Sequence, residues 1–164
     1  MPNPLSHYPL SEDASGVITF GTQHAAVYHI SFIPVTSVFL LVAGDKVEIE
    51  NYQIIIENPG QLRTAGDSKV GATVCKAIAE FFEKHPLRTV TYVCNFGDNR
   101  QLARHRKFSG WYRRYGADAK VAKQDEVVRA EDNDFPISLL LIENHPHFEL
   151  LVKQFSEDVQ TLNK

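Results

Sequence analysis

Runs rich in aromatic and β-branched residues recur through the first sixty positions and alternate with polar residues where they are longer, which predicts β-strands. Such runs occupy residues 17–20, 26–33, 38–42 and 47–57, and turn-forming residues such as Gly21, Pro34 and Gly44 end the first three. The connections between the runs are short, whereas parallel neighbours need long crossovers. We therefore expect an antiparallel β-meander over residues 15–60.

Beyond residue 66 the apolar residues adopt the spacing of helices. Asp67 is a good N-cap for a first helix that ends near residue 85, with its apolar face formed by Val70, Val74, Ala77, Ile78 and Phe81. A strand at 89–94 follows. A second helix, capped by Asp98 or Asn99, is predicted over 100–114, and Gly116 ends it. Asn144 can cap a last helix that contains Phe148 and Val159.

The segment between the second and third helices combines two different patterns. Residues 118–134 are the most polar stretch and predict a loop that could hold a short strand around 127–128. Residues 137–142 are apolar except for Ser138, which predicts a strand buried on both faces. The order of elements predicts an α+β fold in which an N-terminal antiparallel β-meander is followed by α-β-α-β-α, with the helices packed on one face of a mixed sheet.

Length and composition are those of one soluble globular domain over residues 1–164. We expect a poorly structured arm at 1–14, the meander at 15–60 and an α/β half at 66–160. No signal peptide or membrane span is recognisable, so we expect a cytoplasmic protein. Cys75 and Cys94 are both interpreted as buried thiols in a reducing compartment.

Charge is distributed very unevenly along the chain. Six of the seventeen Lys and Arg residues lie between Arg100 and Arg114, and no Asp or Glu interrupts them. The remaining chain holds eleven basic and twenty acidic side chains, a balance of −9. A compact cation on an acidic protein indicates an anionic partner, whether nucleic acid, a phosphate-bearing ligand or an acidic protein surface.

On a helical wheel the basic residues form two rows that border the small residues Ala103 and Gly110. One row contains Trp111, which could stack on a base or lie at the edge of the core. The opposite arc, which includes Leu102, His105, Phe108, Ser109 and Tyr112, should pack on the sheet. The candidate residues for binding a partner are Arg100, Arg104, Arg106, Lys107, Trp111, Arg113 and Arg114.

Three hypotheses follow from this pattern. In the first, a non-enzymatic protein uses helix 100–114 to engage an acidic partner, either nucleic acid or protein. In the second, a small enzyme or sensor acts on a phosphorylated or nucleotide ligand where strand 89–94 meets this helix, because a helix N-terminus flanked by arginines can bind an anion. In the third, the basic residues are neutralised internally and the domain has no ligand.

Other chemistry is weakly supported by the sequence. His145 and His147 diverge by about 200° on a starting helix, so they would not meet at one metal ion, and no metal site is expected. Cys94 could be activated by Arg100, but both thiols are more typical of inert buried cysteines. No motif of an enzyme active site is recognisable and no cofactor is expected.

Two segments resemble an uncharacterised family of small Bacteroidetes proteins: Asp-Ser-Lys-Val-Gly-Ala-Thr-Val at 67–74 and Ala-Arg-His-Arg-Lys-Phe at 103–108. The resemblance extends over residues 15–155 and supports the predicted layout of elements. It points to Arg104, Arg106 and Phe108 as residues of interest and implies no activity. Small size and a basic helix are also compatible with a toxin–antitoxin or phage-defence setting.

Overall fold

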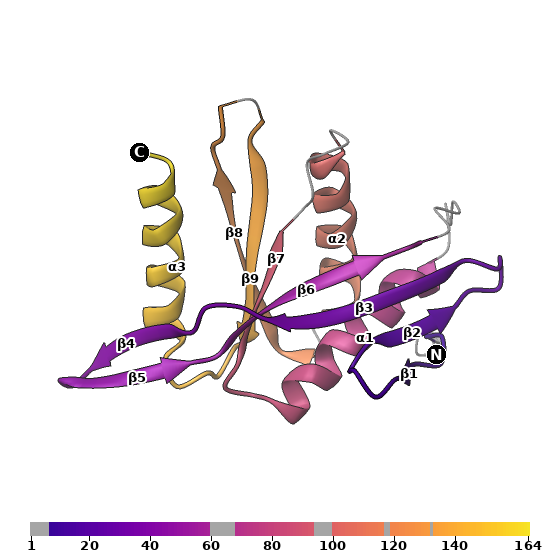
Figure 1. Cartoon of the computed structure of the whole chain (residues 1–164), viewed down its shortest axis with the longest axis horizontal. Coiled ribbons are helices and arrows are strands. Elements are labelled where there is room, and N and C mark those ends of the chain that lie inside the picture. Colours follow the sequence, from indigo (N-terminus) through magenta and orange to yellow (C-terminus); the bar gives the residue numbers. More distant parts are fainter. Residues whose placement is uncertain (1–6, 60–67, 94–99, 117–118, 132) are drawn as a thin grey trace.

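The computed structural model describes residues 7–59, 68–93, 100–116, 119–131 and 133–164. Its centre is a mixed seven-stranded sheet of order β1-β2-β3-β6-β7-β9-β8, in which only β6 and β7 are parallel (Figure 1). The strands in this spatial order are Ser11–Glu12, Ile18–Gly21, Val27–Pro34, Asn51–Glu57, Thr89–Val93, Phe135–Ile142 and Val121–Val128. The predicted α+β class is confirmed: antiparallel strands come first, α1 and α2 lie between later strands, and α3 follows the last strand.

The three helices cover both faces of the sheet, so the prediction that they share one face is wrong. Helices α1 (Ser68–Lys84) and α2 (Gln101–Tyr115) pack over a core that includes Leu140 of β9. Helix α3 (Phe148–Leu162) packs over Leu139 and Leu141 of the same strand. Successive side chains of a strand point to opposite faces, so the apolar run Leu139–Ile142 in β9 requires cover on both sides (Figure 1).

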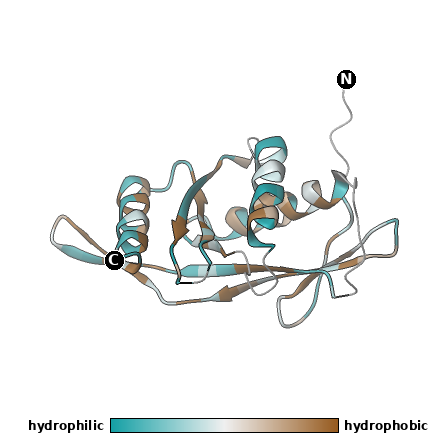
Figure 2. Ribbon diagram, turned by 90° about the horizontal axis from the view of Figure 1, so that it is seen from above, coloured by the Kyte–Doolittle hydropathy of each residue, from teal (hydrophilic) through white to brown (hydrophobic). Residues whose placement is uncertain are grey.

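The predicted strand 47–57 is two strands, and the meander is interrupted. The chain leaves the sheet after β3, forms a separate hairpin of β4 (Val38–Val42) and β5 (Asp45–Ile49), and returns as β6. The two-residue turn between them, Ala43 and Gly44, has positive φ at both positions, as tight hairpin turns require. One face of the hairpin packs beside α3, which stands apart from α1 and α2 (Figure 2).

The polar stretch 118–134 contains a full strand, β8, where a loop was predicted. All eight residues of β8 pair antiparallel with β9. The strand has polar side chains on both faces, with Lys123 and Asp125 toward α2 and Glu126 toward Ser156 of α3. A pattern of apolar and polar residues therefore could not reveal it, because the stabilising partner is the apolar β9.

The expected N-terminal arm is ordered over its described part. Tyr8 is buried, its ring stacks on Phe20 at 6.0 Å, and its backbone N–H donates to Thr73 Oγ1 at 2.8 Å. A single aromatic anchor in a proline-rich segment gives no periodicity, which is why the sequence pattern missed this contact. Within the described residues, no helix is long and apolar enough to cross a membrane.

Candidate basic face and polar groove

The outward face of α2 carries the basic residues that the sequence singled out. Arg106, Lys107, Arg113 and Arg114 are exposed, and none forms an ion pair with a carboxylate in the described part of the chain. Arg100 is exposed at the N-cap position and Arg104 is half-buried. The four exposed cations define what we call the basic face of α2.

Trp111 lies at the edge of the core. Its indole packs against α1 at Gly71, where an added Cβ would come within 2.2 Å of Trp111 Cδ1. Lys107 Nζ lies 5.4 Å from the centre of the same ring, within the range of a cation–π contact. The ring therefore links α2 to α1, in agreement with the core-edge interpretation.

The inward arc of α2 follows the prediction in part. Phe108 is 2% exposed and stacks on Tyr92 at 4.2 Å. Leu102, which was predicted to pack on the sheet, is 56% exposed instead. The remaining members, His105, Ser109 and Tyr112, face β8, where the prediction had placed a loop.

A polar groove of about 490 Å³ separates α2 from β8. Positions 105, 109, 112 and 113 lie on one side of the helix because residues three, four and seven apart share a face. The two polar residues of β8 that face the helix form the opposite wall. The groove is lined by His105, Arg106, Ser109, Tyr112, Arg113, Lys123 and Asp125.

Lys123 is the centre of a hydrogen-bond network in this groove. Its side chain is 4% exposed, and Nζ donates to Ser109 Oγ at 2.9 Å and to Asp125 Oδ1 at 2.5 Å. The Ser138 hydroxyl donates to the same carboxylate oxygen at 2.6 Å. Burying a lysine is unfavourable unless its charge is paired, and here the carboxylate and the serine satisfy it.

The electrostatic environment fixes the charge states of the two residues beside Lys123. Partial burial raises the pKa of Asp125, but hydrogen bonds from Lys123 and Ser138 and the lysine charge outweigh it and hold the pKa below the usual value. Burial and the Lys123 charge lower the pKa of His105, and Asp125 offsets this only in part. At neutral pH the groove thus contains a carboxylate and a neutral imidazole.

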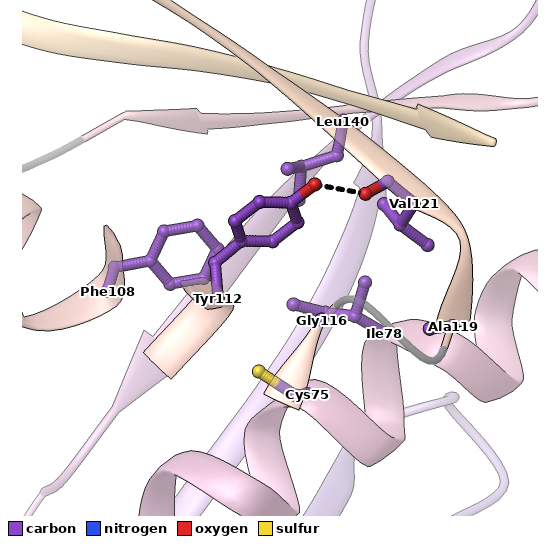
Figure 3. A pocket seen from close by; sticks show the side chains of 8 residues that line it. All are labelled: Cys75, Ile78, Phe108, Tyr112, Gly116, Ala119, Val121 and Leu140. Carbon is purple, nitrogen blue, oxygen red and sulfur yellow. Dashed lines mark hydrogen bonds between the residues drawn. The ribbon is translucent and has the colours of Figure 1, made fainter. Parts of the chain in front are cut away.

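His105 is the least satisfied member of the groove. Its Nε2 lies 4.0 Å from Asp125 Oδ2, too far for a hydrogen bond, and Nδ1 is buried without a hydrogen-bond partner among the described residues. Tyr112 closes the base of the groove, because its hydroxyl donates to the backbone oxygen of Val121 at the start of β8 (Figure 3). This bond fixes α2 against β8.

Beneath Tyr112 lies a small apolar cavity that is enclosed by core side chains and is too small for a ligand. Its volume is about 10 Å³, and Figure 3 shows Cys75, Phe108 and Leu140 around it. Burial raises the pKa of the Cys75 thiol to about 12, which agrees with an inert thiol. Cys94 and Asp67 lie outside the described residues, as do residues 95–99, which join strand 89–94 to helix 100–114 at the ligand site of the second hypothesis.

His145 has a structural role, and the segment 145–147 precedes α3. The backbone N–H of His147 donates to Nδ1 of His145, so Nε2 carries the proton and donates to Leu87 O at 2.9 Å. The ring is 4% exposed and joins the start of α3 to the turn before β7. Asn144 does not cap the helix, because His147 occupies the N-cap position.

Sequence reasoning missed Lys123 and Asp125. They lie in the stretch interpreted as a loop, and their two-residue spacing acquires meaning only on a strand, where it places both side chains on one face. The helical wheel places His105 and Ser109 on the inward arc and predicts that they pack on the sheet, with no indication of a hydrogen-bond network. The network depends on β8 pairing with β9, a contact between segments that no local pattern specifies.

Fold and site together define a small α+β protein with a basic helix beside a polar groove. The chain belongs to a family of unknown function, DUF6169, whose model matches residues 66–157. The match covers α1 through most of α3 and includes the basic face and the groove. Comparison with curated proteins and with solved structures gives no match.

Proposed function

We propose that this protein is a small binding protein that engages an acidic partner, nucleic acid or protein, through the basic face of α2. The observation that supports this proposal is that Arg106, Lys107, Arg113 and Arg114 are exposed together and unpaired with any described carboxylate. Internal neutralisation of the basic residues, the competing hypothesis, would have paired them. Arg100 and Arg104 extend the same surface toward the start of the helix.

The acidic character of the rest of the chain restricts where a polyanion can bind. Outside 100–114 the chain has a balance of −9, so approach at other surfaces is repulsive. Contact through four exposed cations would release a small number of counterions, and the slope of log K against log salt should not exceed about 4 in magnitude. Because Trp111 packs against α1, a nucleic acid would be held by its phosphates rather than by base stacking.

The test compares three fluorescent probes with the full-length protein: a single-stranded RNA 20-mer, a duplex DNA 20-mer and a polyglutamate peptide. Reversal of two charges in Lys107→Glu/Arg114→Glu should weaken binding of the preferred probe at least tenfold. It should also lower the salt slope by about 1.5 to 2. The preferred probe identifies the class of partner.

A matched control makes the same change in net charge elsewhere. Lys84 and Arg129 are exposed and lie outside α2, so Lys84→Glu/Arg129→Glu should change affinity less than threefold. Equal losses in the two variants would mean that only net charge matters, which would overturn a specific role for α2. Failure of all three probes to bind the wild-type protein would also overturn it.

The sequence motifs and the taxonomic range of the family are also part of the proposal. We propose that Asp-x-Lys-Val at 67–70 and Ala-Arg-x-Arg-x-aromatic at 103–108 are shared by family members in Bacteroidetes; both segments lie inside the matched residues. An alignment in which these positions vary freely would contradict this. The cytoplasmic location and the toxin–antitoxin or defence setting are also predictions, which fractionation and the identity of neighbouring genes would test.

A further inference from the structure

We propose that the groove between α2 and β8 is a binding site for a small phosphate monoester that bears hydroxyl groups, a sugar phosphate or a nucleotide. This inference rests on the proposed function, because Arg106 and Arg113 of the basic face also line the groove. It adds a specific ligand class and a specific set of donors and acceptors to that function.

Ser109 supplies a hydrogen-bond donor at the groove wall. Lys123 Nζ has only donors, so in their 2.9 Å contact the serine oxygen accepts. The hydroxyl hydrogen of Ser109 is then available for another acceptor, and the described residues provide none. A donor held in place by a buried lysine is well prepared to receive an oxyanion.

The charges of the groove match a phosphate dianion. Arg106, Arg113 and Lys123 contribute three positive charges and Asp125 one negative charge, while His105 is neutral at pH 7. A phosphate monoester carries a charge of about −1.5 to −2 at this pH and has three terminal oxygens as acceptors. The guanidinium groups of Arg106 and Arg113 and the Ser109 hydroxyl are three donor groups. A phosphate monoester has three terminal oxygens that can accept from them, whereas a carboxylate ligand has only two.

Asp125 is the reason for proposing that the ligand bears hydroxyl groups. Its Oδ1 already accepts from Lys123 and Ser138, whereas Oδ2 receives no hydrogen bond from the described part of the chain. A ligand hydroxyl can donate to Oδ2, which would also separate the carboxylate from the phosphate. The volume of about 490 Å³ is within the range of small-molecule sites and exceeds the needs of a lone phosphate ion.

The same network favours binding over nucleophilic catalysis by Ser109. A general base must accept the serine proton, but Lys123 Nζ donates to both Ser109 Oγ and the Asp125 carboxylate and offers the serine no acceptor. His105, the neighbouring imidazole, has no hydrogen bond to Ser109. The groove is arranged to hold an anion.

The experiment is isothermal titration calorimetry of the full-length protein with ribose 5-phosphate, adenosine 5′-monophosphate, inorganic phosphate and unphosphorylated ribose. We expect ribose 5-phosphate or the nucleotide to bind at least tenfold more tightly than inorganic phosphate, and ribose not to bind. Tighter binding of the nucleotide than of ribose 5-phosphate would identify a base-bearing ligand, and equal binding a sugar phosphate. Absence of binding by both phosphorylated probes would overturn the inference.

Variants locate the site. Arg106→Gln/Arg113→Gln changes exposed side chains and should weaken binding of the monoester at least tenfold without unfolding the protein. Ser109→Ala should weaken it about threefold to tenfold, the value of one hydrogen bond. Lys84→Gln/Arg129→Gln removes the same number of positive charges outside the groove and should bind the monoester as the wild type does. An equal loss of affinity in this control variant would overturn the assignment of the site to the groove.

The two proposals can fail separately. A protein that binds RNA or polyglutamate but no phosphate monoester retains the basic face and refutes only the groove site. A protein that binds the monoester but none of the three polyanions refutes only the proposed function. Circular dichroism of each variant distinguishes loss of binding from loss of the fold.

Discussion

Trp111 of α2 packs so closely on Gly71 of α1 that no side chain fits at position 71: an added Cβ would lie 2.2 Å from Cδ1 of the indole. This contact determines how near α2 lies to α1. It also fixes the orientation of the helix that carries the basic face and one wall of the groove.

Gly71→Ala should therefore force the indole to move. We expect a loss of about 1 to 3 kcal/mol in the free energy of unfolding, the usual result of overpacking. Trp111 is the single tryptophan, so its fluorescence emission should shift as the ring leaves its half-buried position. Denaturant unfolding and emission spectra measure both effects.

Gly110→Ala is the matched control on α2. An added Cβ at Gly110 meets nothing within 4 Å, so alanine should raise stability by about 0.5 to 1 kcal/mol through its better helix propensity. Equal effects of the two substitutions would contradict the close packing at Gly71.

Thr73 joins the N-terminal segment to α1 by a buried hydroxyl. It is fully buried, accepts from Tyr8 N–H at 2.8 Å and donates to Lys69 O at 2.6 Å. Thr73→Val keeps the volume but removes the oxygen that accepts from Tyr8 N–H, and should reduce the free energy of unfolding by about 1 to 3 kcal/mol. Thr73→Ser keeps the hydroxyl and should preserve amide protection at Tyr8 in hydrogen exchange, whereas fast exchange in both variants would argue against this bond.

Stability should decrease as the pH falls from 7 toward 5. Burial and neighbouring cations lower the pKa of His85 and of His105, so the folded state binds these two protons less well than the unfolded chain. The contribution of each histidine is complete above the ordinary pKa of about 6.5 and is lost as the pH falls through the lower folded value. Thermal unfolding at several pH values measures the slope.

His105→Gln should reduce the slope of stability against pH by the contribution of His105, and His85→Gln should reduce it by the contribution of His85. The double variant is expected to have the smallest slope between pH 7 and 5. A slope in His105→Gln that equals the wild-type slope would show that the groove imidazole is not the titrating group.

Cys75 should be unreactive in the folded protein. Its pKa is raised from 9.0 to about 12, so the thiolate fraction at pH 8 is about a thousandfold lower than in the unfolded chain. In a Cys94→Ser background, reaction with Ellman's reagent should be at least a hundredfold slower before denaturation than after it. Cys75 is half-buried rather than fully buried, and rapid modification of the native protein would refute the raised pKa of its thiol.

Local patterns were sufficient for elements that carry their own signal. The periodic apolar residues of α1 predicted its position to within a residue or two, and the largely apolar run in β9 predicted a strand buried on both faces. The cluster of basic residues on one helix was also visible directly, because consecutive positions fix which side chains share a face.

Contacts between distant segments decided the rest. Nothing in the chemistry of residues 47–57 indicates that Glu50 divides two strands, β5 and β6. The first of them, β5, lies outside the main sheet and pairs with β4. In that hairpin Leu40 is buried beside α3, whereas Leu41 is 77% exposed. The same holds for β8, whose polar residues form a strand only because β9 provides the hydrogen-bond partner.

The sequence by itself determined the α+β class, the three helices and the basic face of α2, since each depends on residues that are close along the chain. Only the tertiary structure placed α3 on the opposite face of the sheet and brought Lys123 and Asp125 to Ser109 and His105. The physical reason is that these contacts join residues far apart along the chain, so they depend on which elements become neighbours. That choice is made by packing over the whole domain.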